Sequence, residues 1–174
     1  MREGGKILAE ILQELVVAVK VGMTTNDLDS IASRLMEERG VKPSFLGYNN
    51  FPASICTSIN EEVVHGVPSD RELKEGDVLK IDIGILHKGF HTDTATTVII
   101  GNNPNDLQRK LLNVTRESLN IGIAKAKVGN TLGDIGSAIQ KYVESQGFNV
   151  VRELVGHGIG KNLHEEPSVP NFGE

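Results

Sequence analysis

The strongest constraint on the fold of this chain is that part of its sequence occurs twice. When the 174-residue sequence is shifted by 107 residues, 20–40 aligns without a gap on 127–147, and eight of the 21 positions are identical. A repeat of this length is too long for a solenoid and indicates two similar halves related by a pseudo-twofold axis. The alternative is that two amphipathic helices ending in glycine resemble each other by chance.

Each copy of the repeat is followed by an extended stretch and then by a histidine–glycine pair, at His65 and at His157. In the first half, Asp82 and Asp93 lie 17 and 28 residues beyond His65. The same spacing counted from His157 reaches the final residue, Glu174, and then passes beyond it. We therefore expect a second half that stops where its counterpart of this segment would begin.

Apolar residues at helical spacing predict the helices. The stripe over 7–19 has one apolar face, and a second helix over 24–40 begins at a threonine pair and ends at a glycine. Helices are expected again between 105 and 147.

The remaining segments have the character of strands. Short extended pieces broken by proline and glycine fill 41–68, and 78–86 alternates between apolar and polar residues. A turn at 87–89 leads into a threonine-rich returning strand over 90–100, and a valine-rich strand is predicted over 148–155. The sequence therefore predicts a mixed α/β (α+β) fold with an antiparallel sheet flanked by helices.

Composition excludes several classes of function. The chain carries 18 Lys and Arg against 23 Asp and Glu, so no basic excess favours nucleic acid binding. The single cysteine, Cys56, cannot form an internal disulfide, which favours a reducing compartment. Charged residues interrupt the apolar N-terminal segment, so neither a signal peptide nor a membrane span is predicted. These features favour a cytoplasmic protein that handles small molecules or peptides.

Two aspartates mark the candidate site. Asp82 lies in the middle of the alternating strand and Asp93 on the returning strand, and a tight turn between the strands puts both on one face of the hairpin. Like charges so placed destabilise a hairpin unless a shared proton, a basic partner or a metal cation compensates for them. The alternative is the polar, solvent-facing side of an edge hairpin.

Histidines near the other end of the chain support the interpretation of the aspartate pair as a metal site. His157 stands among three glycines, and His164 follows it by seven residues. Carboxylates with one imidazole suit Mn, Fe or Co and also Zn, whereas a structural zinc site needs other ligands. No phosphate-binding glycine loop or dinucleotide motif competes with this interpretation, and Cys56 is predicted to be a core thiol and not a nucleophile.

The chain resembles the type I methionine aminopeptidases from end to end. That family has the two-halved pita-bread fold that prolidases and creatinase share. The Asn-Glu-x-Val-Val-His-Gly-x-Pro block at 60–68 is specific to the aminopeptidases, whereas Gly-His-Gly at 156–158 is shared with prolidases. Ile-Asp-Ile-Gly at 81–84 and His-Thr-Asp at 91–93 complete the match. The resemblance implies a single catalytic domain over 1–174, with a first half at 1–101 and a partial second half at 102–174.

The resemblance also implies a role for each metal ligand. Asp82 resembles the bidentate ligand of one metal, Asp93 the carboxylate that bridges two metals, and His157 the imidazole ligand of the second. The family holds two divalent ions per site, which are Co, Mn, Fe or Zn. Two glutamate ligands that the family has further downstream have no counterpart here, so we expect the 174-residue chain alone to bind metal weakly and to release no methionine.

The resemblance assigns the substrate contacts to two histidines and to an apolar pocket. His65 resembles the histidine that contacts substrate near the scissile bond, and His164 the one that hydrogen-bonds the scissile carbonyl, so both are candidate catalytic and substrate-binding residues. The pocket for the methionine side chain is implied to be lined by Phe45, Tyr48, Phe51 and Cys56. Plain core packing is the alternative for these four side chains.

The implied activity is removal of the N-terminal methionine from nascent peptides by a metal-bound hydroxide. The implied setting is a cytoplasmic monomer that meets nascent polypeptide N-termini at the ribosome and binds neither nucleic acid nor membrane. Two rival functions are a prolidase-like Xaa-Pro peptidase and a non-catalytic binding module with the same fold.

Overall fold

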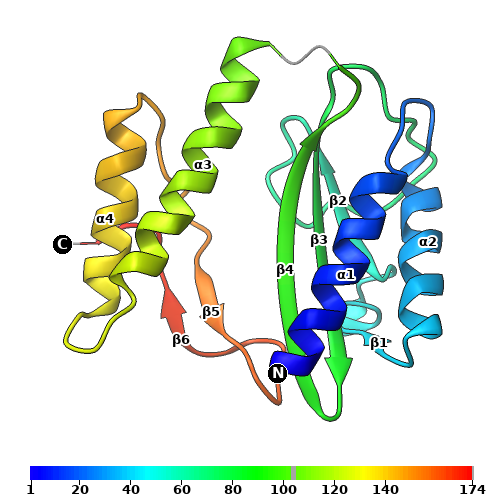
Figure 1. Cartoon of the computed structure of the whole chain (residues 1–174), viewed down its shortest axis with the longest axis horizontal. Helices are drawn as coiled ribbons and strands as arrows, with labels where there is room; N and C mark the ends of the chain where they lie inside the picture. Colours follow the sequence, from blue (N-terminus) through cyan, green and yellow to red (C-terminus); the bar gives the residue numbers. More distant parts are fainter. Residues whose placement is uncertain (103–104, 174) are drawn as a thin grey trace. The chain divides into compact units, whose positions relative to one another are not determined.

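The computed structural model describes residues 1–102 and 105–173. These residues form two compact units, one made of 1–102 and 159–163 and the other of 105–158 and 164–173. Figure 1 labels the elements of both units.

The first unit is an antiparallel sheet with two helices. The sheet contains β1 (Lys42–Pro43), β2 (Ile55–Ile59), β3 (Val78–His87) and β4 (Phe90–Ile99), and the helices are α1 (Arg2–Ala18) and α2 (Thr25–Glu38). A short 3-10 helix, η1 (Tyr48–Asn50), lies between β1 and β2. β4 pairs with the whole length of β3, and β1 and β2 pair with successive parts of β3. The predicted helix pair and hairpin are confirmed.

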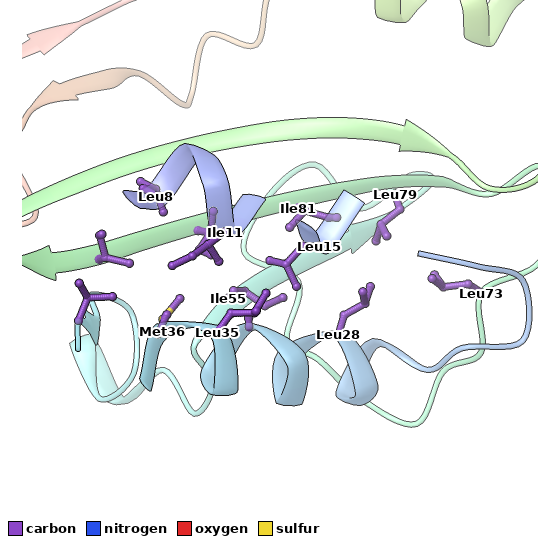
Figure 2. Close-up of a cluster of buried hydrophobic side chains, with 14 of the residues drawn as sticks. Leu8, Ile11, Leu15, Leu28, Leu35, Met36, Ile55, Leu73, Leu79 and Ile81 are labelled. Atoms are coloured by element: carbon purple, nitrogen blue, oxygen red, sulfur yellow. The ribbon is translucent and has the colours of Figure 1, made fainter. Parts of the chain in front are cut away.

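The hydrophobic core lies on the helix-covered face of this sheet. The alternating β3 residues Leu79, Ile81, Ile83 and Ile85 have no exposed surface. Figure 2 shows Leu79 and Ile81 beside side chains of both helices, among them Leu15 of α1. Because side chains alternate along a strand, the residues between these four, Lys80, Asp82 and Gly84 among them, face away from the core. One face of β3 therefore holds the fold together and leaves the other for polar side chains.

A two-residue turn fixes the register of the β3–β4 hairpin. His87 pairs with Phe90, so Lys88 and Gly89 form the turn, with φ values of 51° and 79°. Two successive positive φ values suit the right-handed twist of a hairpin, and glycine adopts such a conformation without strain.

The two copies of the sequence repeat have the same local structure. Thr24 and Asp27 form a reciprocal capping box at the start of α2, and Thr131 and Asp134 form the same box at the start of α4 (Leu132–Ser145). Hydrogen bonds from the cap threonines hold the pKa of both aspartates below its usual range. The two copies of the repeat therefore share the same N-terminal cap and the same helix length of 14 residues.

The second unit contains α3 (Asp106–Lys125), α4 and a two-stranded sheet of β5 (Gly156–Gly158) and β6 (Glu165–Val169). The predicted strand over 148–155 is wrong. No residue of that segment, all of which the structure describes, belongs to a strand, and Val151 and Val155 are each 43% exposed. An apolar segment becomes a strand only where a neighbouring strand accepts its hydrogen bonds, and this segment pairs with none of the described residues.

No helix in the described part of the chain combines the length and the apolar character that crossing a membrane requires.

One buried threonine provides a test of the core. The Thr57 hydroxyl, on β2, is buried and has no hydrogen-bond partner among the described residues. We expect Thr57→Val to raise the free energy of unfolding by about 1 kcal/mol, because it removes an unsatisfied polar group at nearly constant volume. Urea denaturation measures the change.

Thr25 is the matched control for this substitution. It is equally buried, but its hydroxyl donates to the Ser69 carbonyl and accepts from the Ser69 N–H. Thr25→Val should therefore lower the free energy of unfolding. Loss of stability in both variants would mean that the Thr57 hydroxyl has a partner.

Candidate functional site

Asp82 and Asp93 lie on the face of the sheet opposite the core. Asp82 pairs with Ala95 and Gly84 pairs with Asp93, so the aspartates are diagonal neighbours on adjacent antiparallel strands. The shared face agrees with the sequence prediction. The pair is diagonal and not directly opposite because the turn lies at Lys88–Gly89, one residue later than a symmetric pairing needs.

The two carboxyl groups interact strongly. Partial burial, the negative charge of Asp93 and a hydrogen bond between the two side chains raise the pKa of Asp82 from 3.8 to about 7, against a smaller lowering by the Ile83 N–H. Two acidic groups so close retain a proton between them when nothing else neutralises their charge. A divalent cation is the other neutraliser that this oxygen-rich arrangement fits. The pair is therefore suited to hold a metal.

Each unit by itself supplies fewer than three grouped metal-ligating side chains among the residues that the structure describes. The third predicted ligand, His157, lies on β5 in the second unit, and its Nδ1 is 2.8 Å from the Gly158 carbonyl oxygen. Because a carbonyl only accepts, Nδ1 carries the proton, and the lone pair of the neutral ring is on Nε2. The ligand set Asp82, Asp93 and His157 stays a prediction.

The two histidines of the second unit are close together. The ring centroids of His157 and His164 are 4.1 Å apart. Gly158 lets β5 pack closely on β6, because a Cβ there would lie 2.3 Å from the Glu166 carbonyl oxygen. A glycine after His157 is thus required by the packing of β5 against β6.

An apolar cluster adjoins the aspartate pair. Phe45, Cys56 and Leu163 are buried together, with Phe51 and Ile159 packed against them. Cys56 of β2 pairs directly with Asp82, so the cluster borders the carboxylates on the same face of the sheet.

Three of the four predicted pocket residues belong to this cluster, namely Phe45, Phe51 and Cys56. The fourth, Tyr48, lies on η1 and is 40% exposed. Sequence reasoning missed Leu163. No local sequence pattern signalled it, because its contact with Phe45 joins residues more than 100 positions apart.

The Cys56 thiol is kept protonated. Burial, followed by the charges of Asp82 and Asp93, raises its pKa to about 12. A thiol in this state is a poor nucleophile, so the structure agrees with the sequence prediction that Cys56 packs and does not attack.

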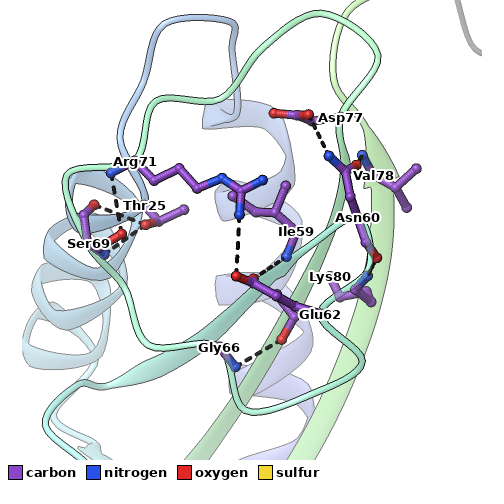
Figure 3. Close-up of polar contacts among 11 residues, drawn as sticks. Thr25, Ile59, Asn60, Glu62, Gly66, Ser69, Arg71, Asp77, Val78 and Lys80 are labelled. Atoms are coloured by element: carbon purple, nitrogen blue, oxygen red, sulfur yellow. Dashed lines mark hydrogen bonds and ion pairs between the residues drawn. The ribbon is translucent and has the colours of Figure 1, made fainter.

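The loop that carries His65 is fixed at its first residue (Figure 3). The Asn60 side chain donates to the Asp77 carboxylate and accepts from the Val78 N–H, each at 2.9 Å. The backbone carbonyl of Asn60 accepts from the Lys80 ammonium at 2.7 Å. The loop therefore begins directly after β2 at a residue that is tied to the start of β3.

The same loop is fixed again just after His65. The Gly66 N–H donates to the Ser58 hydroxyl at 3.0 Å, and the Gly66 carbonyl accepts from the Thr57 N–H at 2.8 Å. A Cβ at Gly66 would lie 2.2 Å from the Thr57 carbonyl oxygen. His65 itself is exposed, with a left-handed φ of 59°. The loop presents an exposed imidazole from a backbone held on both sides.

Comparison with known proteins identifies the chain's relatives. Residues 1–174 match the model of metallopeptidase family M24. The chain is 51% identical over 173 residues to methionine aminopeptidase 1 of Bacillus subtilis, which covers 99% of this chain and 69% of the relative. It is 40% identical to the crystal structure of a methionine aminopeptidase from Thermotoga maritima, with a TM-score of 0.97 over 100% of this chain and 70% of that one.

Prolidases share the fold at greater distance. The prolidase from Pyrococcus furiosus is 24% identical, with a TM-score of 0.82 over 100% of this chain and 52% of that one. The mixed fold with an antiparallel sheet and helices is therefore the pita-bread fold, and the predicted resemblance to methionine aminopeptidases is confirmed. On the evidence of sequence and fold together, the chain belongs to metallopeptidase family M24, whose members are hydrolases that act on peptides with a divalent metal.

Proposed function

We propose that this protein removes the N-terminal methionine from peptides. The observation that carries the proposal is the Asp82–Asp93 pair beside an apolar cluster, joined through Cys56. A pair of carboxylates can hold a metal, and an adjoining apolar pocket can bind an unbranched thioether side chain. The identity of 51% to a methionine aminopeptidase supports this specificity.

In this proposal Asp82, Asp93 and His157 hold the divalent metal. The site takes two ions, of Co, Mn, Fe or Zn. When bound, such an ion lowers the pKa of a coordinated water and polarises the substrate carbonyl. Asp93 would contribute its carboxylate to both ions, and because Nδ1 of His157 donates to the Gly158 carbonyl, Nε2 would be the ligand atom of that ring.

The protein's own residues bind and orient the peptide. His65 and His164 contact the substrate around the scissile bond, and Phe45, Tyr48, Phe51 and Cys56 receive the methionine side chain. The substrates in this proposal are nascent polypeptides leaving the ribosome, met by a monomer in the cytoplasm.

A peptide panel tests the function. Purified protein, as the 174 residues alone and with a C-terminal extension that adds the two downstream glutamate ligands, is loaded in turn with Mn, Fe, Co and Zn. Each form is given Met-Gly-type and Xaa-Pro peptides, and the release of the first residue is measured. We expect the extended form to release methionine with at least one metal and to cleave Xaa-Pro peptides little, and the 174 residues alone to release none above background. The extended form is the protein used for the activity measurements on all variants. Preference for Xaa-Pro would make the protein a prolidase-like peptidase, and cleavage of neither class would favour a non-catalytic module.

A histidine substitution separates substrate contact from metal binding. In the C-terminally extended form, we expect His65→Ala to lower kcat by about 10- to 100-fold, because a side chain that orients the substrate at the scissile bond is lost. The metal content, measured by mass spectrometry, should stay unchanged. As a control, His87→Gln, beside Glu3 at the far end of β3, should leave kcat nearly unaffected. Loss of metal from His65→Ala would reassign His65 to the metal site.

A further inference from the structure

The position of Phe45 depends on a glycine in β3. Gly84 pairs with Asp93 and faces the same side of the sheet as Asp82. A Cβ on Gly84 would lie 2.8 Å from Cε1 of the Phe45 ring and 3.1 Å from Cβ of Ser44. Contacts under 3.0 Å force a displacement, so the Phe45 ring lies where it does because residue 84 has no side chain.

Ser44 holds the same segment by two hydrogen bonds. Its N–H donates to the Gly84 carbonyl at 2.9 Å, and its hydroxyl lies 2.8 Å from Nδ1 of His91. Ser44 is 6% exposed and Phe45 is 9% exposed, so neither has room to move without repacking. The segment leading into the apolar cluster is thereby tied to both strands of the hairpin that carries the aspartates.

His91, which is hydrogen-bonded to Ser44, also contacts the segment on the other side of the apolar cluster. Its backbone N–H donates to the Gly160 carbonyl at 2.7 Å. Gly160 lies between Ile159 and Leu163, which pack on Phe45 and Cys56. One residue of β4 therefore anchors both segments that enclose the apolar cluster.

We propose that Gly84, Ser44 and His91 are positioning residues that fix Phe45 against β3 and thereby set which N-terminal side chain the apolar cluster accepts. The proposal rests on the proposed function in taking this cluster as the pocket for the first residue of the substrate. An unbranched side chain can lie flat along a rigid aromatic ring. Such a ring therefore binds it more tightly than a branched side chain of similar volume. The recognised ligand is thus an unbranched apolar side chain, and displacement of the Phe45 ring lets the cluster accept branched side chains.

Four variants test the proposal. Gly84→Ala displaces the ring, His91→Phe removes the bond to Ser44, and His91→Asn keeps a polar atom where Nδ1 was. Gly5→Ala in α1 is the matched control, since a Cβ there meets nothing within 4 Å.

The selectivity is the ratio of kcat/KM for Met-Gly to that for Leu-Gly peptides. We expect Gly84→Ala to lower it about tenfold, mainly through a higher KM for the methionyl peptide, as for a pocket contact worth one methylene. His91→Phe should lower it in the same direction, and His91→Asn should restore it. In a Phe45→Ala background, Gly84→Ala should have no further effect.

A second measurement follows the contact itself. The Gly84 Hα that points along the missing Cβ lies against the Phe45 ring, so its NMR shift carries a ring-current contribution. His91→Phe should abolish that contribution and His91→Asn should retain it. Selectivity that stays unchanged in Gly84→Ala, or changes equally when Phe45 is absent, would overturn the proposal.

Failure of the proposed function can be told apart from failure of this inference. If the C-terminally extended form of the natural sequence releases no methionine with any metal, the proposed function is wrong. The same variants are then compared by the ratio of dissociation constants for L-methioninamide and L-leucinamide. A ratio that is one in the natural sequence, or that Gly84→Ala leaves unaltered, would overturn the inference as well.

Discussion

Replacing either aspartate of the pair by asparagine should remove the metal and the activity together. Asp82→Asn and Asp93→Asn each delete a charged oxygen ligand at nearly constant volume. Loss of a group that only orients a metal ligand costs about 10- to 100-fold in affinity or activity, so loss of a ligand should exceed about 100-fold. The measurements are the affinity for Mn²⁺ by calorimetry and the release of methionine from a Met-Gly-type peptide.

Asp70→Asn is the matched control for these variants. Asp70 is exposed, lies in the loop between β2 and β3, and accepts a hydrogen bond from the Asn26 side chain of α2. Its substitution removes the same charge from the protein and should leave metal affinity and activity within about twofold. An Asp82→Asn protein that binds Mn²⁺ normally would exclude Asp82 as a ligand.

The metal-free protein should lose stability as the pH rises from about 4 to about 7. The pKa of Asp82 is raised in the folded state to about 7 from 3.8, so between these values the folded state binds more protons than the unfolded state. Stability therefore falls with increasing pH across this window, and the contribution is complete only below the unfolded pKa. The expected loss from this group across the whole window is on the order of 4 kcal/mol.

Comparison with Asp82→Asn isolates this group from all the others that titrate. In EDTA, urea denaturation between pH 4 and pH 8 should find the variant more stable than the natural sequence at pH 8, with the difference shrinking as the pH falls towards 4. Saturating Mn²⁺ should reverse the order at pH 8, because the metal binds the folded natural sequence and not the variant. Parallel pH profiles for the two proteins would mean that Asp82 is ionised normally in the folded state.

The sequence alone predicted the helices and strands that have a clear local pattern of apolar or capping residues. The alternation of Leu79, Ile81 and Ile83 predicted a strand with one buried face, and the threonine at each repeat predicted where a helix begins. The prediction of a strand over 148–155 was wrong because a valine-rich composition indicates strand propensity but not whether a partner strand is present.

The same limit applies to the site. The sequence predicted that Asp82 and Asp93 share a face, because side chains alternate along the two strands of a tight hairpin. Their diagonal offset depended on which two of residues 87–89 form the turn, a choice made by the backbone of Lys88 and Gly89. Leu163 was missed because it meets Phe45 across more than 100 residues of sequence, and no local pattern encodes such a contact.

The most direct test of the carboxylate pair as a metal centre is anomalous diffraction from crystals of the protein grown with Co²⁺. Data collected on either side of the cobalt absorption edge locate the ion without reference to the protein model. We expect an anomalous peak with carboxylate oxygens of both Asp82 and Asp93 at about 2.0–2.2 Å, the usual distance for such ligands of a transition metal. A protein that binds Co²⁺ with its strongest peak away from these two side chains would contradict the proposed site.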